Sequence, residues 1–584
     1  MSEPKQIAQR LDTHSMDEAA SRKAVVIKTA SRPLVPIVFF PGVMGTRLKL
    51  SSGTDDFLWD PDSKAGIFKH YLFGGLLNYK DGTDDDIRGA ARRMSAPGQL
   101  ISVLDGSHLD DEKTRIRGAL IGKDSTDKQA NTAFIGQEME RRQARGWSSL
   151  FYDSYIPLLQ MLDCWGRGLP VKHAGADGKI KTHHNLQSLH PVWAFGYDWR
   201  RGADLIAEGG GPYASGEHFK AFLQKVFADA YAELPKWHWP GKKQVIVVTH
   251  SMGSLVARYI SEVVGCGADM AGIVHLAQPT TGAPAATLRL MMGTQAEADA
   301  SLGGDEDRIV RNIMGLSPYR YLSEVAQLVG PNTLLSSNDY SADPVKAVAG
   351  PGEPIDWIQW LDPKGAHNTF VSQAAVDTAR GPSGLPKLHK HERLGWAAPR
   401  YWTRWETNGT SGYLPCTMSL DEKQSWRADA ASIKTGMEPA SQPGKVPGKT
   451  KFDEISEAYL GADAIITSLR LKHHPKTTAI HAASRQTITR LTLELVPHGV
   501  PYVDPKTLLP SPKVLPIFKL VWKFIQGPGD GTVPASSGKA LGSVGATSGD
   551  AVSGGNSDHQ SLGNNSAARL QLLDALENLA RPFR

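Results

Sequence analysis

Short apolar runs alternate with amphipathic helical patterns along this chain, and this alternation constrains the fold more than any other feature. The first run, 34–40, is rich in β-branched and aromatic residues and ends at a Pro-Gly pair. Similar runs follow at 192–197, 245–248 and 273–276. Continuous apolar runs are typical of strands that are buried on both faces. Strands separated by helices indicate βαβ units, so we expect an α/β fold with a mostly parallel, doubly wound sheet.

The helices between and after these runs are indicated by apolar residues at helical spacing. Such patterns cover 150–162, 219–230 and 255–263, and a last one covers 570–579. Spacings of three and four residues place the apolar side chains on one helix face. Pro157 lies inside the first pattern and is expected to kink or end that helix.

Length and composition allow a large buried core and argue against some function classes. The chain has 584 residues, of which 40% are hydrophobic. Lys and Arg number 65 against 60 Asp and Glu, a net charge of +5. A charge this small over so long a chain does not favour a nucleic-acid partner. Cys164, Cys266 and Cys416 are odd in number and far apart, so no disulfide framework is expected.

The same alternation divides the chain into a core and insertions. Residues 1–32 are polar and are interpreted as a leader, and 33–284 as the first part of the core, with an insertion over about 49–145. The alternation fails over 285–510, which is predicted to be an inserted cap or lid. Apolar and helical patterns resume over 511–584, which is predicted to complete the core.

No segment has the features of a targeting or membrane-spanning element. The first thirty residues lack an apolar stretch of about 7–15 residues, and no run approaches about 18 uninterrupted apolar residues. We therefore expect a protein made in the cytoplasm without a signal peptide or transmembrane helix. Any export would have to bypass the classical secretory route.

A candidate nucleophile lies where the third apolar run meets the following helix. Ser251 stands at this strand-to-helix junction, which is the context of a nucleophile elbow. The tight turn needs small residues two positions to either side of the serine. Gly253 meets this need, whereas Thr249 stands where the pattern has glycine. The alternative is that Ser251 only caps the helix.

Two further residues could complete a Ser-Asp-His set. Asp530 lies in a glycine-flanked turn, and His559 lies in a loop just before the last helical pattern. The order Ser, Asp, His is that of α/β-hydrolases. In this chemistry His559 accepts the proton of Ser251, and Asp530 orients the imidazole. Taken singly, Asp530 could be an ordinary turn residue and His559 a surface residue.

Backbone amides are expected to bind the negatively charged oxygen of the tetrahedral intermediate. One is the amide of Met252, directly after the candidate nucleophile. The other is the amide of Val43, in the glycine-containing loop 41–48 that follows the first strand. Glycines let a backbone approach a substrate closely. The loop could instead be a purely structural turn.

Five short motifs together resemble the lipase branch that contains lecithin:cholesterol acyltransferase and lysosomal phospholipase A2. They are Pro41-Gly42-x-x-Gly45, Tyr197-Asp198-Trp199-Arg200, Thr249-His250-Ser251-Met252-Gly253, Gly529-Asp530-Gly531-Thr532 and Asp558-His559-Gln560-Ser561. The resemblance covers a minority of the chain, at 34–48, 190–284 and 525–580. It implies an α/β-hydrolase fold with large cap or lid insertions, a Ser-Asp-His triad and acyl esters of membrane phospholipids as substrates.

Relatives in this branch usually carry signal peptides and disulfides, which this sequence lacks. A lipase of this branch without them resembles a bacterial type VI secretion lipase effector. This resemblance implies export through an injection apparatus, action on the membranes of a neighbouring cell, and an immunity protein and a secretion carrier as partners. The sequence does not indicate an oligomeric state.

Other functions remain open. A hydrolase sheet without chemistry would be a binding or scaffold protein, and Thr249 is the residue that favours this alternative. The motifs do not separate a phospholipase from an acyltransferase or a hydrolase of small soluble esters. No cofactor and no metal are predicted. The acidic residues at 81–86 lack calcium-loop spacing, and the histidine pairs at 183–184 and 473–474 lack metal-ligand spacing.

Two polar segments are interpreted as supporting parts of the site. Asp198 is expected to pair with Arg200 or Arg201 and to shape the pocket wall. The basic and aromatic segment 387–405 is interpreted either as a lid that meets a membrane or as ordinary cap core.

Overall fold

The structure is a computed structural model of the chain. The residues that it describes are 33–50, 57–62, 98–104, 106–121, 128–174, 180–183, 185–203, 215–233, 243–292, 325, 328–337, 339–343, 346, 348, 358–361, 367–369, 404–407, 410–413, 451–503, 510–541, 547–549, 551–553 and 557–583. The predicted leader, 1–32, and much of the predicted cap lie outside these residues.

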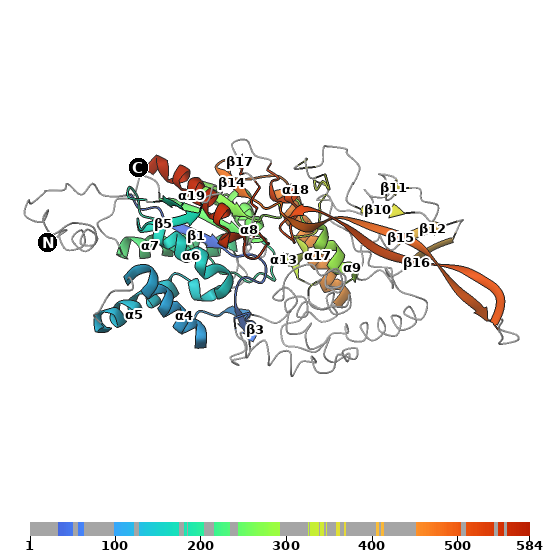
Figure 1. The fold of residues 1–584 in the computed structure, drawn as a ribbon, viewed down its shortest axis with the longest axis horizontal. Coiled ribbons are helices and arrows are strands. Elements are labelled where there is room, and N and C mark those ends of the chain that lie inside the picture. Colours follow the sequence, from blue (N-terminus) through green and yellow to red (C-terminus); the bar gives the residue numbers. More distant parts are fainter. Residues whose placement is uncertain are drawn as a thin grey trace, which may run out of the picture.

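A six-stranded sheet forms the centre of the fold (Figure 1). Its order is β17-β14-β9-β8-β1-β7, and every neighbouring pair is parallel. The strands are β1 (Ile37–Phe40), β7 (Val192–Ala194), β8 (Val245–His250), β9 (Met270–Leu276), β14 (Thr477–Ile480) and β17 (Thr547–Ser548). The strands predicted from the four apolar runs are thus confirmed as β1, β7, β8 and β9.

Helices cover both faces of this sheet. One face carries α7 (Ser215–Glu233), α8 (Gly253–Glu262) and α17 (Lys451–Leu469), and the other carries α6 (Tyr152–Gly166) and α19 (Ser566–Ala580). Alternate strand residues supply the two cores: Val38 and Val247 pack on the first face, and Ile37 and Ile246 on the second. The predicted α/β class, with a parallel sheet between two helical layers, is therefore confirmed.

The predicted helices are also present, with small shifts at their ends. Patterns at 219–230, 255–263 and 570–579 correspond to α7, α8 and α19. Pro157 lies inside α6 and does not end it. Pro157 is the sixth residue of α6, so its missing N–H costs one intrahelical hydrogen bond. The helix continues because its buried residues on both sides of Pro157 pack against the central sheet.

The remaining elements lie outside the central six-stranded sheet. β2 (Leu48–Leu50), β3 (Phe57–Trp59) and β4 (Gly98–Leu100) form a sheet in the order β3-β2-β4, and β5 (Val171–Ala174) pairs with β6 (Ile180–His183), as β12 (Arg404–Thr407) does with β13 (Thr410–Tyr413). The other helices are α4 (Gly106–Ile116), α5 (Lys128–Ala144), α9 (Pro284–Met292), α13 (Val329–Asn332) and α18 (Ala535–Gly538). Single helical turns lie at Arg117–Ile121, Trp147–Ser149, Cys266–Asp269, Leu562–Asn564 and Arg581–Phe583.

A long antiparallel hairpin projects away from the central sheet (Figure 1). It consists of β15 (Arg485–Val503) and β16 (Pro510–Gly529), and it forms a four-stranded sheet with β10 (Ile358–Leu361) and β11 (His367–Thr369). Because Arg485 pairs with Gly529, the chain leaves the core and returns to it at the same place.

This hairpin and β14 change the predicted domain boundaries. β14 lies within the interval 285–510 that was predicted as an insertion, yet it pairs with β9 in the central sheet. The predicted boundary between residues 510 and 511 falls at the start of β16 and would assign the two strands of the hairpin to different domains. The sequence pattern did not predict β14, because this short strand, Thr-Thr-Ala-Ile, contains no apolar run. Residues 515–524 are the apolar part of the segment 511–584 that was predicted to complete the core, and they belong instead to β16.

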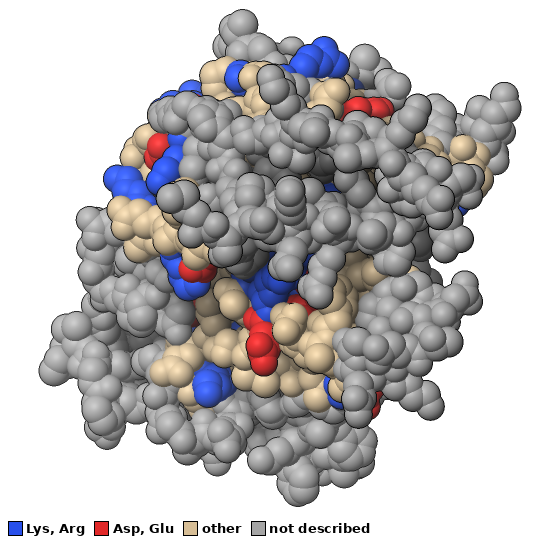
Figure 2. Space-filling model, turned by 90° about the vertical axis from the view of Figure 1, so that its left-hand side faces the viewer, with Lys and Arg blue, Asp and Glu red and all other residues tan. Residues whose placement is uncertain are grey.

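The described surface carries charges of both signs. Figure 2 shows the face at the left of Figure 1, where basic and acidic side chains are interspersed among uncharged ones. This mixture agrees with the small net charge of +5. Among the described residues, no helix combines the length and apolar character needed to span a bilayer.

Burial in the central sheet predicts the cost of shortening its side chains. Ile246 on β8 is fully buried, whereas Ile525 on β16 is 45% exposed. Ile246→Ala is expected to lower the free energy of unfolding by about 2–5 kcal/mol through lost burial and a cavity. Ile525→Ala, the matched control, is expected to stay within about 0.5 kcal/mol. Urea denaturation measures both, and equal losses would contradict the placement of β8 at the centre.

Candidate active site

Ser251 occupies the sharp turn between β8 and α8. Its φ of 50° lies in the left-handed region, where a non-glycine residue stores strain of about 1–3 kcal/mol. Its amide donates a hydrogen bond to the carbonyl of Leu276, at the end of β9 (2.9 Å). Helix α8 begins two residues later, at Gly253. This is the strand, strained turn and helix that a nucleophile elbow requires.

The residues two positions on either side of Ser251 fit the turn in different ways. A Cβ atom on Gly253 would lie 2.4 Å from the carbonyl oxygen of Pro41, so only glycine fits there. Thr249 is fully buried, and its Oγ1 lies 2.7 Å from Nδ1 of His275 on the adjacent strand. The β-branched residue that departs from the motif therefore has a polar partner and does not disturb the turn.

The structure brings Ser251, His559 and Asp530 into one hydrogen-bonded row. Nε2 of His559 lies 2.8 Å from Oγ of Ser251, and Nδ1 of His559 lies 2.7 Å from Oδ2 of Asp530. Ser251 and Asp530 are 3% and 2% exposed, whereas the His559 side chain is 14% exposed. Three residues spread over about half of the sequence thus meet with the imidazole between the hydroxyl and the carboxylate.

The carboxylate is fixed by the turn that carries it. Its Oδ1 accepts hydrogen bonds from the amides of Thr532 (2.9 Å) and Val533 (2.6 Å), which leaves Oδ2 to face His559. The amide of His559 also donates to the backbone carbonyl of Asp530 (2.8 Å). The loop of the imidazole and the turn of the carboxylate are therefore joined by both backbone and side chains.

The loop predicted to supply an amide donor packs directly on the serine. A Cβ atom on Gly42 would lie 2.9 Å from Cβ of Ser251. The amides of Val43 and Met252 donate no hydrogen bond to any acceptor among the described residues. Met252 is also the N-cap of α8, where the helix dipole favours negative charge. Both amides thus stay available beside Ser251, as an oxyanion site requires.

Two aromatic side chains donate hydrogen bonds to backbone carbonyls of the loop 41–48. The hydroxyl of Tyr197 donates to the carbonyl of Pro41 (2.7 Å), and the indole N–H of Trp59 donates to the carbonyl of Met44 (2.6 Å). Met44 itself has a φ of 61°. The strained loop is therefore held by hydrogen bonds at its first residue, Pro41, and at Met44.

A second hydrogen-bonded row, Gly42–Tyr155–His250–His559, meets the first at His559. The amide of Gly42 donates to the hydroxyl of Tyr155 (3.0 Å), which lies 3.0 Å from Nδ1 of His250. Nε2 of His250 lies 2.8 Å from the carbonyl oxygen of His559. A carbonyl only accepts, so Nε2 carries the proton and Nδ1 accepts from the tyrosine. This row links the loop 41–48, called the donor loop because it carries the amide of Val43, to the backbone of His559.

Burial keeps His250 neutral. Loss of solvent, followed by the nearby His559, lowers the pKa of His250 to about 3. Burial likewise raises the pKa of Tyr155 to about 12. Neither group is expected to titrate near neutral pH, so the second row keeps its hydrogen-bond directions over that range.

Other residues singled out in the sequence have defined places. Asp198 pairs with Arg200 at 2.6 Å, and Arg201 lies 3.5 Å away, which confirms the predicted local pair. Asp558 accepts a hydrogen bond from the amide of Ser561 (3.0 Å) and is not part of either row. The acidic residues at 81–86 and the segment 387–403 lie outside the described residues.

The sequence patterns assign no role to Tyr155 or His250. Tyr155 was recognised only as one residue of a helical pattern. Its hydroxyl contacts Gly42 and His250, which are 113 and 95 positions away in the chain. No local pattern signals contacts at such separations.

One solved structure resembles this fold along nearly its whole length. Its title is "The crystal structure of Tle4-Tli4 complex", the TM-score is 0.53, and the identity is 16%. The match covers 94% of this chain and 99% of the matched chain. At this identity the likeness concerns the fold alone. No family model and no curated protein sequence matches the chain.

The lowered pKa of His250 predicts acid sensitivity. In the unfolded chain this histidine binds a proton below about pH 6.5, whereas in the folded chain it does so only near pH 3. Its contribution to stability is therefore complete above pH 6.5 and is lost as the pH falls toward 3, by at most about 1.4 kcal/mol per pH unit. Unfolding free energies at pH 7, 6 and 5 should fall less steeply in His250→Gln than in wild type. Identical slopes would contradict a buried neutral His250.

Proposed function

We propose that the chain is a serine-dependent lipase of the α/β-hydrolase fold, which hydrolyses acyl esters of membrane phospholipids through an acyl-enzyme. The row of Ser251, His559 and Asp530, with contacts of 2.8 and 2.7 Å on the two sides of one imidazole, carries this proposal. The strained φ of Ser251 and the two available amides next to it support the same chemistry.

The first half of the proposed reaction attaches the acyl group to Ser251. The hydroxyl oxygen attacks the ester carbonyl while Nε2 of His559 accepts the proton. Asp530 accepts the hydrogen bond from Nδ1, which fixes the tautomer and stabilises the imidazolium. The negative charge on the former carbonyl oxygen is bound by the amides of Val43 and Met252, each worth about 3 kcal/mol. His559 then donates its proton to the alkoxide oxygen that leaves.

The second half releases the acyl group. A water molecule gives its proton to Nε2 of His559 as its oxygen attacks the acyl carbon. The tetrahedral intermediate then collapses, Ser251 regains its proton from His559, and a free fatty acid leaves. An acyltransferase would use another alcohol in place of water at this step, with the same residues in the same roles.

The proposed substrate and setting follow from the motif resemblance. Lipases of the branch that these motifs resemble act on acyl lipids in membranes. The matched structure is titled as a complex of two proteins, Tle4 and Tli4. By analogy we propose that this chain is a type VI secretion effector that attacks the membranes of a neighbouring cell and is bound by an immunity protein.

Separate substitutions of the reacting residues test the chemistry. Ser251→Ala, Asp530→Asn and His559→Asn are each expected to lower turnover of a short soluble ester by about 10³-fold or more, because members of such a row act as a unit. Asp558→Asn, next to the imidazole but outside the row, is the matched control and should stay within a few-fold of wild type. Activity within a few-fold of wild type in any of the three variants would remove that residue from the mechanism.

Defined phospholipid vesicles test the substrate. Mass spectrometry of the products is expected to detect a free fatty acid and a lysophospholipid with wild-type protein and neither with Ser251→Ala. Turnover of the soluble ester with no release from vesicles would favour a hydrolase of small esters. Transfer of the acyl chain to an added alcohol in preference to water would favour an acyltransferase.

Tyr155→Phe tests the second row, in which the tyrosine is a positioning residue. Removing its hydroxyl leaves the amide of Gly42 and Nδ1 of His250 without this partner. An unsatisfied buried polar group costs about 1–3 kcal/mol, so kcat for the soluble ester should fall about 10-fold with little change in KM. Tyr231→Phe, at a tyrosine that is 54% exposed, is the matched control. An unaltered kcat in Tyr155→Phe would show that the row does not position the donor loop.

A further inference from the structure

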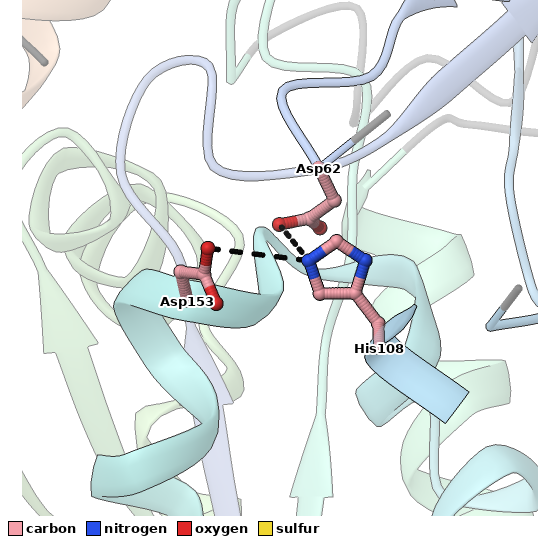
Figure 3. A group of neighbouring side chains, drawn as sticks. All are labelled: Asp62, His108 and Asp153. Carbon is pink, nitrogen blue, oxygen red and sulfur yellow. Dashed lines mark ion pairs between the residues drawn. The ribbon is translucent and has the colours of Figure 1, made fainter. Parts of the chain in front are cut away.

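Three potential metal ligands from distant parts of the chain converge beside the candidate site (Figure 3). Asp62 follows β3, His108 lies on α4, and Asp153 lies in the first turn of α6. Nε2 of His108 is 4.0 Å from Oδ1 of Asp62 and 3.9 Å from Oδ2 of Asp153. One ligand atom from each residue lies within 4.8 Å of the other two. These separations are too long for hydrogen bonds.

The buried carboxylate of Asp62 leaves one oxygen unsatisfied. Its side chain is 1% exposed, and Oδ2 accepts a hydrogen bond from the amide of Tyr152 (2.8 Å). Oδ1 is buried, has no hydrogen-bond partner among the residues that the structure describes, and faces the imidazole of His108. A buried acceptor without a partner costs about 1–3 kcal/mol, so this oxygen marks the place where a ligand is needed.

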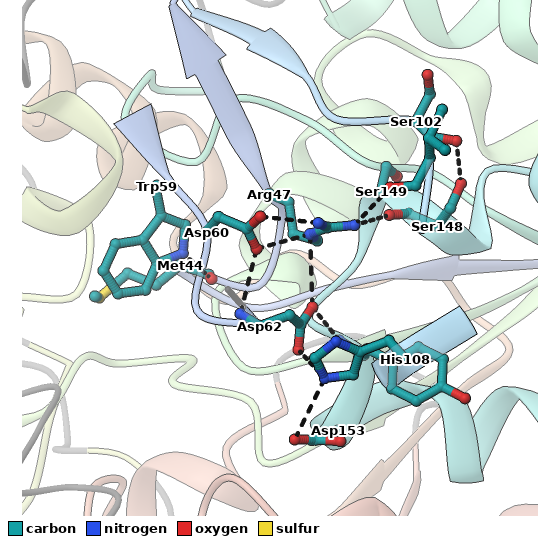
Figure 4. Close-up of polar contacts among 12 residues, drawn as sticks. Met44, Arg47, Trp59, Asp60, Asp62, Ser102, His108, Ser148, Ser149 and Asp153 are labelled. Carbon is teal, nitrogen blue, oxygen red and sulfur yellow. Dashed lines mark hydrogen bonds and ion pairs between the residues drawn. The ribbon is translucent and has the colours of Figure 1, made fainter. Parts of the chain in front are cut away.

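The nearest permanent cation does not satisfy that oxygen. Figure 4 shows the guanidinium of Arg47 between its partners: it binds both carboxylate oxygens of Asp60 at 2.8 Å. Its other contacts include the carbonyls of Val103 and Ser148. Arg47 comes no closer to Asp62 than 3.6 Å, at Oδ2. Burial, only partly opposed by the Tyr152 amide and Arg47, raises the pKa of Asp62 to about 7.

We propose that Asp62, His108 and Asp153 bind a divalent zinc ion. In a tetrahedral zinc site with ligands at about 2.0–2.2 Å, neighbouring ligand atoms lie about 3.4 Å apart. The two histidine separations, 4.0 and 3.9 Å, would therefore each shorten by about 0.5 Å when an ion binds. The exposed side chain of Asp153 can close the remaining distance, since 67% of it is accessible. An imidazole with carboxylates selects zinc over calcium or magnesium, which prefer oxygen ligands alone. Water completes the tetrahedron on the exposed side.

The ion would act as a clamp on the support of the candidate site. It would join α4, from the predicted insertion 49–145, to the N-terminus of α6. The next two residues of α6 reach the site directly: Ser154 accepts a hydrogen bond from Gln560 (2.7 Å), and Tyr155 holds Gly42. His108 also packs edge-on against Tyr152, with ring centroids 5.0 Å apart, which orients its imidazole.

Zinc binding by the purified full-length chain tests this proposal without any use of activity. The protein is treated with chelator, dialysed and titrated with zinc sulfate in a calorimeter. One ion per chain is expected, with a higher melting temperature in its presence. Asp153→Asn and His108→Gln should each weaken binding about 10-fold or more. Circular dichroism checks that both variants remain folded, which we expect for Asp153→Asn because that side chain is exposed.

Asp110→Asn is the matched control, since this carboxylate lies on α4, is 80% exposed and pairs with Lys113. It should bind zinc as wild type does. The proposal is overturned if wild type has a dissociation constant above about 1 mM. It is equally overturned if both variants bind within three-fold of wild type. Tighter binding of calcium or magnesium than of zinc in parallel titrations would overturn the assignment to zinc.

Discussion

The strained turn at Ser251 is the constraint on which the rest of the site depends. Its positive φ is held from both sides, by the hydrogen bond to Leu276 and by the close approach of Gly253 to the end of β1. Strain of this kind persists only where the surroundings over-determine the backbone. Because β8 lies in the middle of the parallel sheet, its neighbours β1 and β9 supply those surroundings. The loop 41–48, which carries the amide of Val43, and the imidazole of His559 are then arranged around the hydroxyl of Ser251, whose position is already fixed.

Two hydrogen-bonded rows meet at His559 and make the geometry mutually dependent. The first row contains the ring of His559, between Ser251 and Asp530. The second row ends at the backbone carbonyl of His559. The turn of Asp530 is also tied to the base of the hairpin, because the amide of Gly531 donates to Oγ1 of Thr487 (2.8 Å). The hairpin of β15 and β16 therefore begins and ends next to the turn that carries Asp530. For this reason the large insertion does not displace the carboxylate from the site.

Much of the core follows from the sequence, and the supporting contacts do not. The apolar runs of β1 and β8 signal strands because both of their faces are buried, and the order Ser, Asp, His indicates a shared edge. β14 gives no such signal, since two of its four residues are threonines, and so the domain boundary was misplaced. The sequence likewise gives no signal for the contacts of Tyr155 or for the cluster of Asp62, His108 and Asp153. Their partners lie tens of residues or more away and follow no periodic spacing. Local patterns report burial, while such pairings depend on how distant segments pack.

The central claim is that Ser251 is a nucleophile activated by His559, and covalent labelling tests it most directly. A fluorophosphonate reacts with an activated serine to form a stable phosphonyl ester. Intact-mass and peptide analysis of the labelled protein should find one modification, on Ser251, and labelling should be lost in Ser251→Ala and strongly slowed in His559→Asn. Folded wild-type protein that stays unmodified, or that carries the label on another residue, would contradict the account.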